Sequence, residues 1–342
     1  MGLQAGGQKE RRVKMLEQFM TPGGYTCGEM VKEEDGTVLV FSGETRACFD
    51  GARELWRTAF HPPVELMAIS RLQDGRLIGL SYDDPKPAEV TAAGLNGSTF
   101  SLWYSKDSGE SWEGPQALCA NPGCYYVHNG RILQLSSGRI LIPANWVPPQ
   151  AYGKGIETSD LAGAFYSDDN GATWKESNWI AASTPGDHLA ESIAVELPGG
   201  QVKCFMRSTS GYMRQALSRD GGVTWEPETA TSLRMPCSPF TVAKDPYTQD
   251  YYAVWIHSFP APVYQFPRSP LSLAVSHDNT ASWEFLGDLE CNPNCNYGYP
   301  VMAFQENHLL FLYYVNEQSR SFSYEQNRLK LKIIERASLP LK

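Results

Sequence analysis

The sequence contains no long apolar segment and no excess of basic residues, and each absence excludes a class of protein. Over 342 residues, no apolar run approaches the roughly 18 residues that a membrane-spanning helix needs. Asp and Glu number 38 against 29 Lys and Arg, and the formal net charge is −9. This balance argues against nucleic acid or an anionic membrane as a partner, because both select basic surfaces. A small anionic ligand held by a few buried arginines remains compatible with it.

Cysteine is also scarce, since the 8 cysteines are too few for a disulfide scaffold. The close pairs Cys119/Cys124 and Cys291/Cys295 lack the ligand spacing of a zinc site, so we expect free thiols and no metal. Glycine motifs that bind dinucleotides or phosphates are absent, and no cofactor is expected.

The N-terminal segment, residues 1–22, carries charges but no apolar core of a secretory signal, which leaves the cytoplasm as the default location. A short helix is expected there, near residues 9–19. The remainder of the chain is rich in aromatic and turn-forming residues, with 9 Trp, 17 Tyr, 14 Phe, 30 Gly and 23 Pro. That mixture favours many short strands joined by tight turns.

One octamer, Ser-x-Asp-x-Gly-x-Ser/Thr-Trp, recurs at residues 105–112, 167–174 and 218–225, with a copy at 276–283 in which Thr280 replaces the glycine. The pattern predicts a self-contained hairpin turn. The Asp side chain accepts backbone N–H bonds, the Gly adopts a positive φ, and the Trp packs on the sheet.

A second repeat, a turn followed by an apolar strand, appears six times at intervals of roughly forty to sixty residues. Each copy is the strand–turn–strand unit of a β-propeller blade. The sequence therefore predicts an all-β protein: one domain over residues 23–342, a six-bladed β-propeller with four-stranded antiparallel blades.

The octamer resembles the Asp-box, and the blade pattern resembles the sialidase (neuraminidase) superfamily of six-bladed propellers over residues 23–334. The resemblance implies a retaining exo-glycoside hydrolase acting on a terminal sugar. It also implies that the Asp-boxes mark the fold and lie on the face opposite the substrate pocket. The function has to be argued from other residues.

By this resemblance Tyr299 is the nucleophile, Glu191 is the base that assists it, and Asp50 is the acid/base residue. An anomeric carboxylate repels a carboxylate nucleophile, so a tyrosine activated by a neighbouring glutamate suits an acidic sugar. A separate aspartate protonates the leaving oxygen and later activates water.

Arginines that match the family's carboxylate-binding residues are Arg214 and Arg268, because paired N–H donors fit a carboxylate. The family's first-blade arginine is absent, since residues 24–29 read Gly-Tyr-Thr-Cys-Gly-Glu. Arg46 is a candidate replacement. Trp146 and His128 are candidates for stacking on or hydrogen bonding to a sugar ring. In a propeller the inner strands line a central channel, and one end of that channel is the expected site. Further polar residues expected at this channel mouth are Glu29, Asn129, Asn145, Arg207 and His257.

Three functions are compatible with these residues. The first is a sialidase-like glycosidase, with sialic acid or, because of the missing arginine, another sugar as its substrate. The second is a non-catalytic carbohydrate-binding propeller, and the third is a protein-interaction propeller. A tyrosine beside a glutamate base favours the first, because a binding module has no need of that pair. The expected partner is a glycan or small glycoside, and the sequence leaves the oligomeric state open.

Overall fold

Short antiparallel strands joined by tight turns make up nearly all of the secondary structure, as the turn and aromatic content predicted. The structure is a computed structural model that describes residues 15–83, 99–118, 124–148, 160–258, 268–317 and 324–341. The helical elements in these ranges are short 3₁₀ turns, and none of them is long and apolar enough to cross a membrane.

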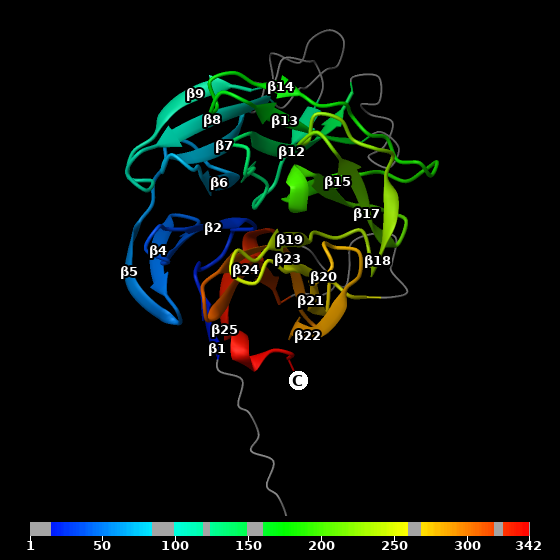
Figure 1. The fold of residues 1–342 in the computed structure, drawn as a ribbon. Coiled ribbons are helices and arrows are strands. Elements are labelled where there is room, and N and C mark those ends of the chain that lie inside the picture. Colours follow the sequence, from blue (N-terminus) through cyan, green and yellow to red (C-terminus); the bar gives the residue numbers. More distant parts are fainter. Residues whose placement is uncertain are drawn as a thin grey trace, which may run out of the picture.

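The strands form six antiparallel sheets that follow one another in chain order around a ring, which confirms the predicted propeller (Figure 1). Blades 1 and 2 comprise β2 (Gly28–Lys32), β3 (Val38–Ser42), β4 (Thr45–Asp50), β5 (Arg53–Ala59), β6 (Ala68–Arg71), β7 (Leu77–Asp83), β8 (Thr99–Ser105) and β9 (Glu113–Ala117). Blade 3 comprises β10 (Cys124–Tyr126), β11 (Leu133–Gln134), β12 (Ile140–Val147), β13 (Leu161–Ser167) and β14 (Lys175–Glu176).

Blades 4 and 5 comprise β15 (Ala190–Glu196), β16 (Val202–Arg207), β17 (Tyr212–Ser218), β18 (Thr229–Arg234), β19 (Thr241–Lys244), β20 (Tyr251–Ile256), β21 (Leu271–Ser276) and β22 (Glu284–Glu290). Blade 6 comprises β23 (Asn296–Phe304), β24 (His308–Asn316), β25 (Arg328–Glu335) and β1 (Met15–Phe19). Apolar side chains fill the spaces between neighbouring sheets, so the core is divided into clusters around the ring.

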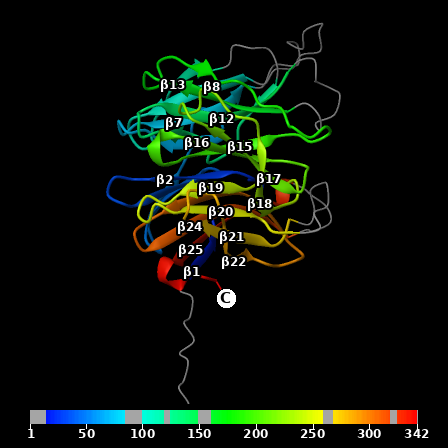
Figure 2. The ribbon, with the colours of Figure 1, turned by 45° about the vertical axis from the view of Figure 1, so that its right-hand side comes forward.

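The N-terminal strand β1 closes the ring. It pairs antiparallel with β25 and forms the outer strand of blade 6, next to the C-terminal strands (Figure 2). The helix expected near residues 9–19 is therefore wrong over Met15–Phe19, while residues 1–14 lie outside the described part. Pairing with β25 supplies the hydrogen bonds that decide the conformation of this segment, and alternate residues of β1 are half-buried.

The four octamer copies form the turns between the third and fourth strands of blades 2 to 5, and their predicted bonding is confirmed. In the first copy Asp107 accepts hydrogen bonds from the backbone N–H of Ser111 at 2.9 Å and from its hydroxyl at 2.6 Å. Gly109 has φ +89°, and Thr280, in the place of that glycine, has φ +69°.

The inner strands of blades 1, 2 and 3 are tied together at the centre of the ring by the buried carboxylate of Glu29. Its Oε2 accepts hydrogen bonds from the backbone N–H groups of Gly130 at 2.7 Å and Ile69 at 3.3 Å, and its Oε1 accepts one from Met30 at 3.3 Å. Burial raises the pKa of Glu29 to about 7, although these hydrogen bonds and the charge of Arg131 oppose the rise.

Blades 4, 5 and 6 join the same centre through Asn129 and Arg131, both buried. The Asn129 amide donates to the carbonyl oxygens of Gly28 at 3.0 Å and Tyr299 at 2.9 Å. The Arg131 guanidinium donates to the backbone carbonyls of Asn129, Glu191 and Phe240. We call Glu29, Asn129 and Arg131 the central hub, because together they contact residues in or next to the inner strand of every blade.

Candidate active site

Tyr299 and Glu191 meet near the starts of two inner strands, β23 of blade 6 and β15 of blade 4. The Tyr299 hydroxyl donates a hydrogen bond of 2.8 Å to Oε1 of Glu191. Each residue lies at an irregularity in its strand, in β23 and β15, and each has a left-handed backbone with φ of +47° and +48°. A left-handed non-glycine residue costs about 1–3 kcal/mol and persists only where the surroundings impose it. These bulges direct the two side chains toward each other.

Arg207 completes an ion pair with the same carboxylate. Its Nη1 lies 2.7 Å from Oε1 of Glu191, and its Nε donates to Sγ of Cys237 at 3.1 Å. Arg207 ends β16 and pairs with Ala190 in β15, so the ladder itself places the guanidinium beside Glu191. The side chains of Arg207, Glu191 and Cys237 are largely buried.

Asn145 in β12 holds both flanks of Glu191. Its Oδ1 accepts the backbone N–H of Ser192 at 2.9 Å, and its Nδ2 donates to the carbonyl oxygen of Leu189 at 2.7 Å. Because an amide that uses both ends fixes its partners' backbone, blade 3 helps to set the bulge in blade 4.

Glu191 is held in its ionised form. Burial alone would raise its pKa, but the charge of Arg207, with smaller effects of His128, Tyr299 and Arg268, lowers that pKa to about 2. Burial together with the charge of Glu191 raises the pKa of Tyr299 well above 10, so its hydroxyl stays protonated. The resting pair is therefore a phenol hydrogen-bonded to a carboxylate.

His128 packs against both members of this pair. Its Nε2 lies 3.5 Å from Oε1 of Glu191, and its ring centroid lies 4.8 Å from that of Tyr299. Burial lowers the pKa of His128 to about 4, and this effect is larger than the opposing effect of the Glu191 charge. The imidazole is consequently neutral near pH 7 and offers a hydrogen-bonding, aromatic surface.

Arg268 lies on the other side of the tyrosine. Its Nη1 donates to the hydroxyl of Tyr314 at 2.6 Å, and the ring centroids of Tyr314 and Tyr299 are 6.1 Å apart. The charge of Arg268 is among those that lower the pKa of Glu191. The charges of two arginines thus act on the Glu191 carboxylate, and arginine N–H donors suit an anionic ligand.

A cavity of about 590 Å³ between blades 1 and 2 adjoins this cluster. Its wall includes Cys27, Gly28 and Glu29, and the Asn129 amide joins Gly28 to the backbone of Tyr299. Burial first, and then the charge of Glu191, raise the pKa of the Cys27 thiol, so it remains protonated. Within the described ranges no three His, Cys, Asp or Glu side chains are grouped to hold a metal ion.

A family model described as a BNR repeat-like domain matches residues 87–312, which is more than half of the sequence. The chain belongs to the BNR repeat-like domain family. This membership agrees with the Asp-box turns and the blade count, and it confirms the resemblance on which the sequence prediction was based.

Sialidases are among the relatives of this BNR-repeat protein. Human Sialidase-4 is 30% identical over 161 residues, covering 44% of this chain and 33% of that protein. Anhydrosialidase of Macrobdella decora is 31% identical over 135 residues, covering 36% of this chain and 16% of that protein. The chain thus matches a third or less of these relatives' own length.

Solved structures agree on the fold. The NanB sialidase from Streptococcus pneumoniae superposes with a TM-score of 0.66 at 15% identity, over 94% of this chain and 70% of that one. At such low identity this likeness concerns the six-bladed architecture alone.

The BNR-repeat fold brings four of the predicted site residues together: Tyr299, Glu191, Arg268 and His128. Trp146 is the last residue but one of β12, near the same blade end, but its ring is half-buried between the rings of Tyr125 and Trp179 in the core of blade 3.

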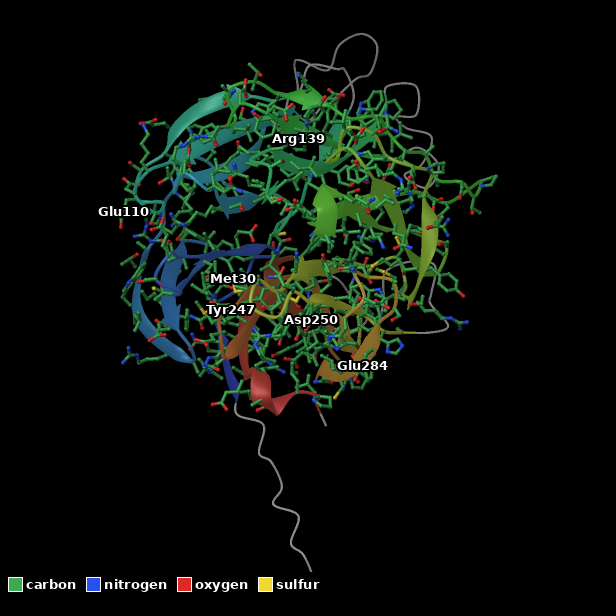
Figure 3. The ribbon with its side chains drawn as sticks, in the orientation of Figure 1. Met30, Glu110, Arg139, Tyr247, Asp250 and Glu284 are labelled. Atoms are coloured by element: carbon green, nitrogen blue, oxygen red, sulfur yellow. The ribbon has the colours of Figure 1, made fainter. Side chains whose placement is uncertain are left out.

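Two predicted arginines are engaged elsewhere. Arg214 forms an ion pair with the buried carboxylate of Glu228. Arg46 donates to the carbonyl oxygen of Ser108 at 2.6 Å and pairs with Glu110, both in the Asp-box turn of blade 2. Glu110 lies at the rim of the ring, whereas Met30 on an inner strand lies near its centre (Figure 3).

Asp50 lies at the other end of the blades from Tyr299. It ends β4, is exposed, and lies 3.6 Å from Arg53. The preceding carbonyl, of Phe49, accepts a hydrogen bond from Gln305, which follows β23. Tyr299 lies five residues before Phe304, about 16 Å of extended strand. The structure does not bring Asp50 into the cluster, because β4 runs away from that end.

Arg207 is the residue that the sequence argument undervalued, since it was expected only among the polar residues of the channel mouth. Arg214 was favoured because it precedes an Asp-box. The useful signal was strand position: Arg207 follows the tight turn at Gly199–Gly200 by one strand length, so it returns to the height of Glu191.

Proposed function

We propose that this protein is a retaining exo-glycosidase of the sialidase type, with Tyr299 as nucleophile and Glu191 as its base. The observation that carries the proposal is the 2.8 Å hydrogen bond from Tyr299 to a buried carboxylate flanked by Arg207 and Arg268. A phenol aimed at an ionised base, with cations beside it, is an arrangement for nucleophilic attack on an anionic sugar.

Charge explains why a tyrosine serves better here than a carboxylate. An acidic sugar brings negative charge close to its anomeric carbon, and a carboxylate nucleophile would be repelled. A neutral phenol approaches without that repulsion and becomes a good nucleophile when Glu191 accepts its proton. Glycosidases with a tyrosine nucleophile form a recognised exception to the two-carboxylate scheme.

Arg207 has a double role in the proposal. It keeps Glu191 ionised at rest, and with Arg268 it supplies N–H donors for a substrate carboxylate. As the proton moves from Tyr299 to Glu191 the ion pair weakens, and Arg207 becomes freer to bind the substrate.

The substrate class is a glycoside whose terminal sugar is acidic. The sialidase names of the relatives favour a sialoside. The first-blade arginine of that family is absent, and the cavity beside Cys27 occupies that part of the ring. A different acidic sugar, such as a uronic acid, is therefore the second substrate to test.

The test uses aryl glycosides with sialic, uronic, deoxy and neutral sugars, assayed by aglycone release with the wild-type protein and two variants. Tyr299→Phe removes the nucleophilic oxygen with almost no change in shape, and we expect activity to fall by at least about 10³-fold while binding persists. Tyr247→Phe, at an exposed tyrosine in the turn between β19 and β20, is the matched control and keeps full activity.

Full turnover by Tyr299→Phe would overturn the nucleophile assignment. Silence of the wild-type protein across the panel, with binding of an acidic sugar retained, would favour the non-catalytic carbohydrate-binding propeller instead.

A further inference from the structure

Acid catalysis at this site needs a carboxyl group other than Glu191, because that carboxylate is committed to Tyr299 and Arg207. Asp50 lies at the other end of the blade. Among the described carboxylates near the cluster, Glu29 is bound by three backbone N–H groups. Asp187 likewise accepts hydrogen bonds at both oxygens, from the hydroxyls of Ser208 and Thr209 and from the backbone N–H groups of His188 and Thr209.

Asp160 differs from these two. It directly precedes β13 in blade 3 and is 4% exposed. Its Oδ2 accepts a hydrogen bond of 2.5 Å from the hydroxyl of Tyr126, whereas its Oδ1 has no hydrogen-bond partner in the described part of the chain. A buried oxygen without a partner normally costs free energy, which makes its retention here a pointer to a ligand.

The strand ladder places Asp160 on the side of blade 3 that faces the cluster. Tyr126 pairs with Asn145, the residue that holds the flanks of Glu191, and Asn145 pairs with Ala162, two residues after Asp160. From Tyr126 the aromatic contacts continue to His128, with ring centroids 6.1 Å apart, and from His128 to Tyr299 at 4.8 Å.

Electrostatics place Asp160 within the field of the same arginine. Burial raises the pKa of Asp160 to about 6, while the Tyr126 hydrogen bond and the charge of Arg207 act in the opposite direction. A carboxyl group that exchanges its proton in this range suits general acid–base catalysis near neutrality. Glu191, with its pKa lowered to about 2, is its ionised counterpart.

We infer that Asp160 is the general acid and base of this site, with Tyr126 as the residue that positions its carboxyl group. The inference rests on the proposed function, since it assigns the proton donor for the reaction in which Tyr299 is the nucleophile.

The reaction balances with these groups alone. In the first step the bond between Tyr299 Oη and the anomeric carbon forms as the glycosidic C–O bond breaks. The phenolic proton passes to Glu191, and the proton of Asp160 passes to the leaving oxygen. In the second step a water oxygen bonds to the anomeric carbon and the bond to Tyr299 breaks. The water gives a proton to Asp160, and Glu191 returns its proton to Tyr299.

The experiment compares Asp160→Asn with the wild type on two substrates of one sugar, a nitrophenyl glycoside with a good leaving group and a methyl glycoside with a poor one. We expect kcat/KM to fall roughly 10²–10⁴-fold on the methyl glycoside and under about tenfold on the nitrophenyl glycoside, because only the poor leaving group needs a proton. Asp50→Asn is the matched control and should lower neither rate.

Tyr126→Phe supplies a readout that misfolding does not imitate. It keeps the carboxyl group of Asp160 but removes the hydrogen bond that stabilises the carboxylate. The pKa of Asp160 should rise, and the alkaline limb of the pH–rate profile should move to higher pH. Thermal melting of each variant verifies folding.

An equal loss on both substrates by a folded Asp160→Asn protein, or a leaving-group-dependent loss in Asp50→Asn, would overturn the inference. Neither result would affect the role of Tyr299, which depends on the Tyr299→Phe assay. A wild-type protein that hydrolyses no glycoside would instead overturn the proposed function.

Discussion

Tyr299 and Glu191 share a rare backbone conformation as well as a hydrogen bond. Both have φ near +48°, at +47° and +48°, and both lie where an inner strand bulges. Regular strand geometry is enough for a hydrogen bond that only stabilises the fold. Here two strained residues from different blades meet in one 2.8 Å contact, which is typical of a functional site. The free energy stored there has to be offset by the hub and by Asn145.

Arg207 should matter more to turnover than Arg214. Arg207→Lys keeps one positive charge, but its single nitrogen cannot replace the two guanidinium nitrogens that bind Glu191 and Cys237. We therefore expect kcat/KM for an acidic glycoside to fall roughly 10- to 100-fold. Arg214→Lys is the matched control, because that side chain faces Glu228, and its kcat/KM should stay within about twofold. Equal losses in the two variants would contradict the site as described.

Glu29 should make the stability of the protein depend on pH. Its pKa is about 7 in the folded protein against 4.5 as the ordinary value, so the native state binds the proton more tightly. The free energy of unfolding should therefore fall as pH rises from about 4.5 to about 7, and level off above that. Between pH 5 and 8 this loss is on the order of 2–3 kcal/mol.

Urea unfolding at several pH values measures it, with Glu29→Gln as the comparison. The variant is less stable at acidic pH, because its amide cannot accept all three backbone hydrogen bonds, but its slope over this pH range should be flatter. Parallel slopes for the two proteins would show that Glu29 does not titrate in this window.

Replacing Asn129 in the hub should lower the free energy of unfolding strongly. Asn129→Ala leaves the buried carbonyl oxygens of Gly28 and Tyr299 without their donor, at a cost of about 2–4 kcal/mol in the free energy of unfolding. Asn294→Ala, at an exposed position, should change it by less than about 0.5 kcal/mol. Chemical denaturation of both variants decides the comparison.

The last Asp-box offers a stabilising change. Thr280 has φ +69°, which a β-branched residue adopts at a cost, whereas glycine adopts it freely. We expect Thr280→Gly to raise the free energy of unfolding by about 0.5–1 kcal/mol. The converse change, Gly222→Ala, should be destabilising, because φ is +87° and a Cβ would lie 2.6 Å from Cδ1 of Leu141. Differential scanning calorimetry distinguishes the two directions.

The fold was predictable because its determinants are local and repeated. Each Asp-box specifies its own turn through side-chain bonds within eight residues, so the copies count the blades without any long-range information. That Tyr299 and Glu191 lie together was predictable for a related reason: both lie near the start of an inner strand, and these starts are readable from the turns that follow.

The errors share a different cause. The strand at Met15–Phe19 depends on pairing with β25, far along the chain, and its own residues do not indicate that pairing. Asp50 was expected in the loop between the second and third strands of blade 1. It instead ends the third strand, β4, and this strand runs to the other end of the blade. Asp160, which we infer to be the general acid, belongs to no sequence motif, and its buried contact with Tyr126 and its unpartnered Oδ1 are visible only in the structure.

The pairing of β1 with β25 has a consequence for how the protein is made. Thr21 accepts a hydrogen bond from the backbone of Leu329, 308 positions later, so the nascent chain carries β1 unpaired until Arg328–Glu335 has left the ribosome. Blades 1 to 5 are complete within their own segments and are free to form in order of synthesis. Blade 6 is completed last, and until β25 pairs with β24 and β1 the strand that carries Tyr299 belongs to an incomplete blade. A ribosome-bound chain halted before β25 should hold folded blades without an assembled site.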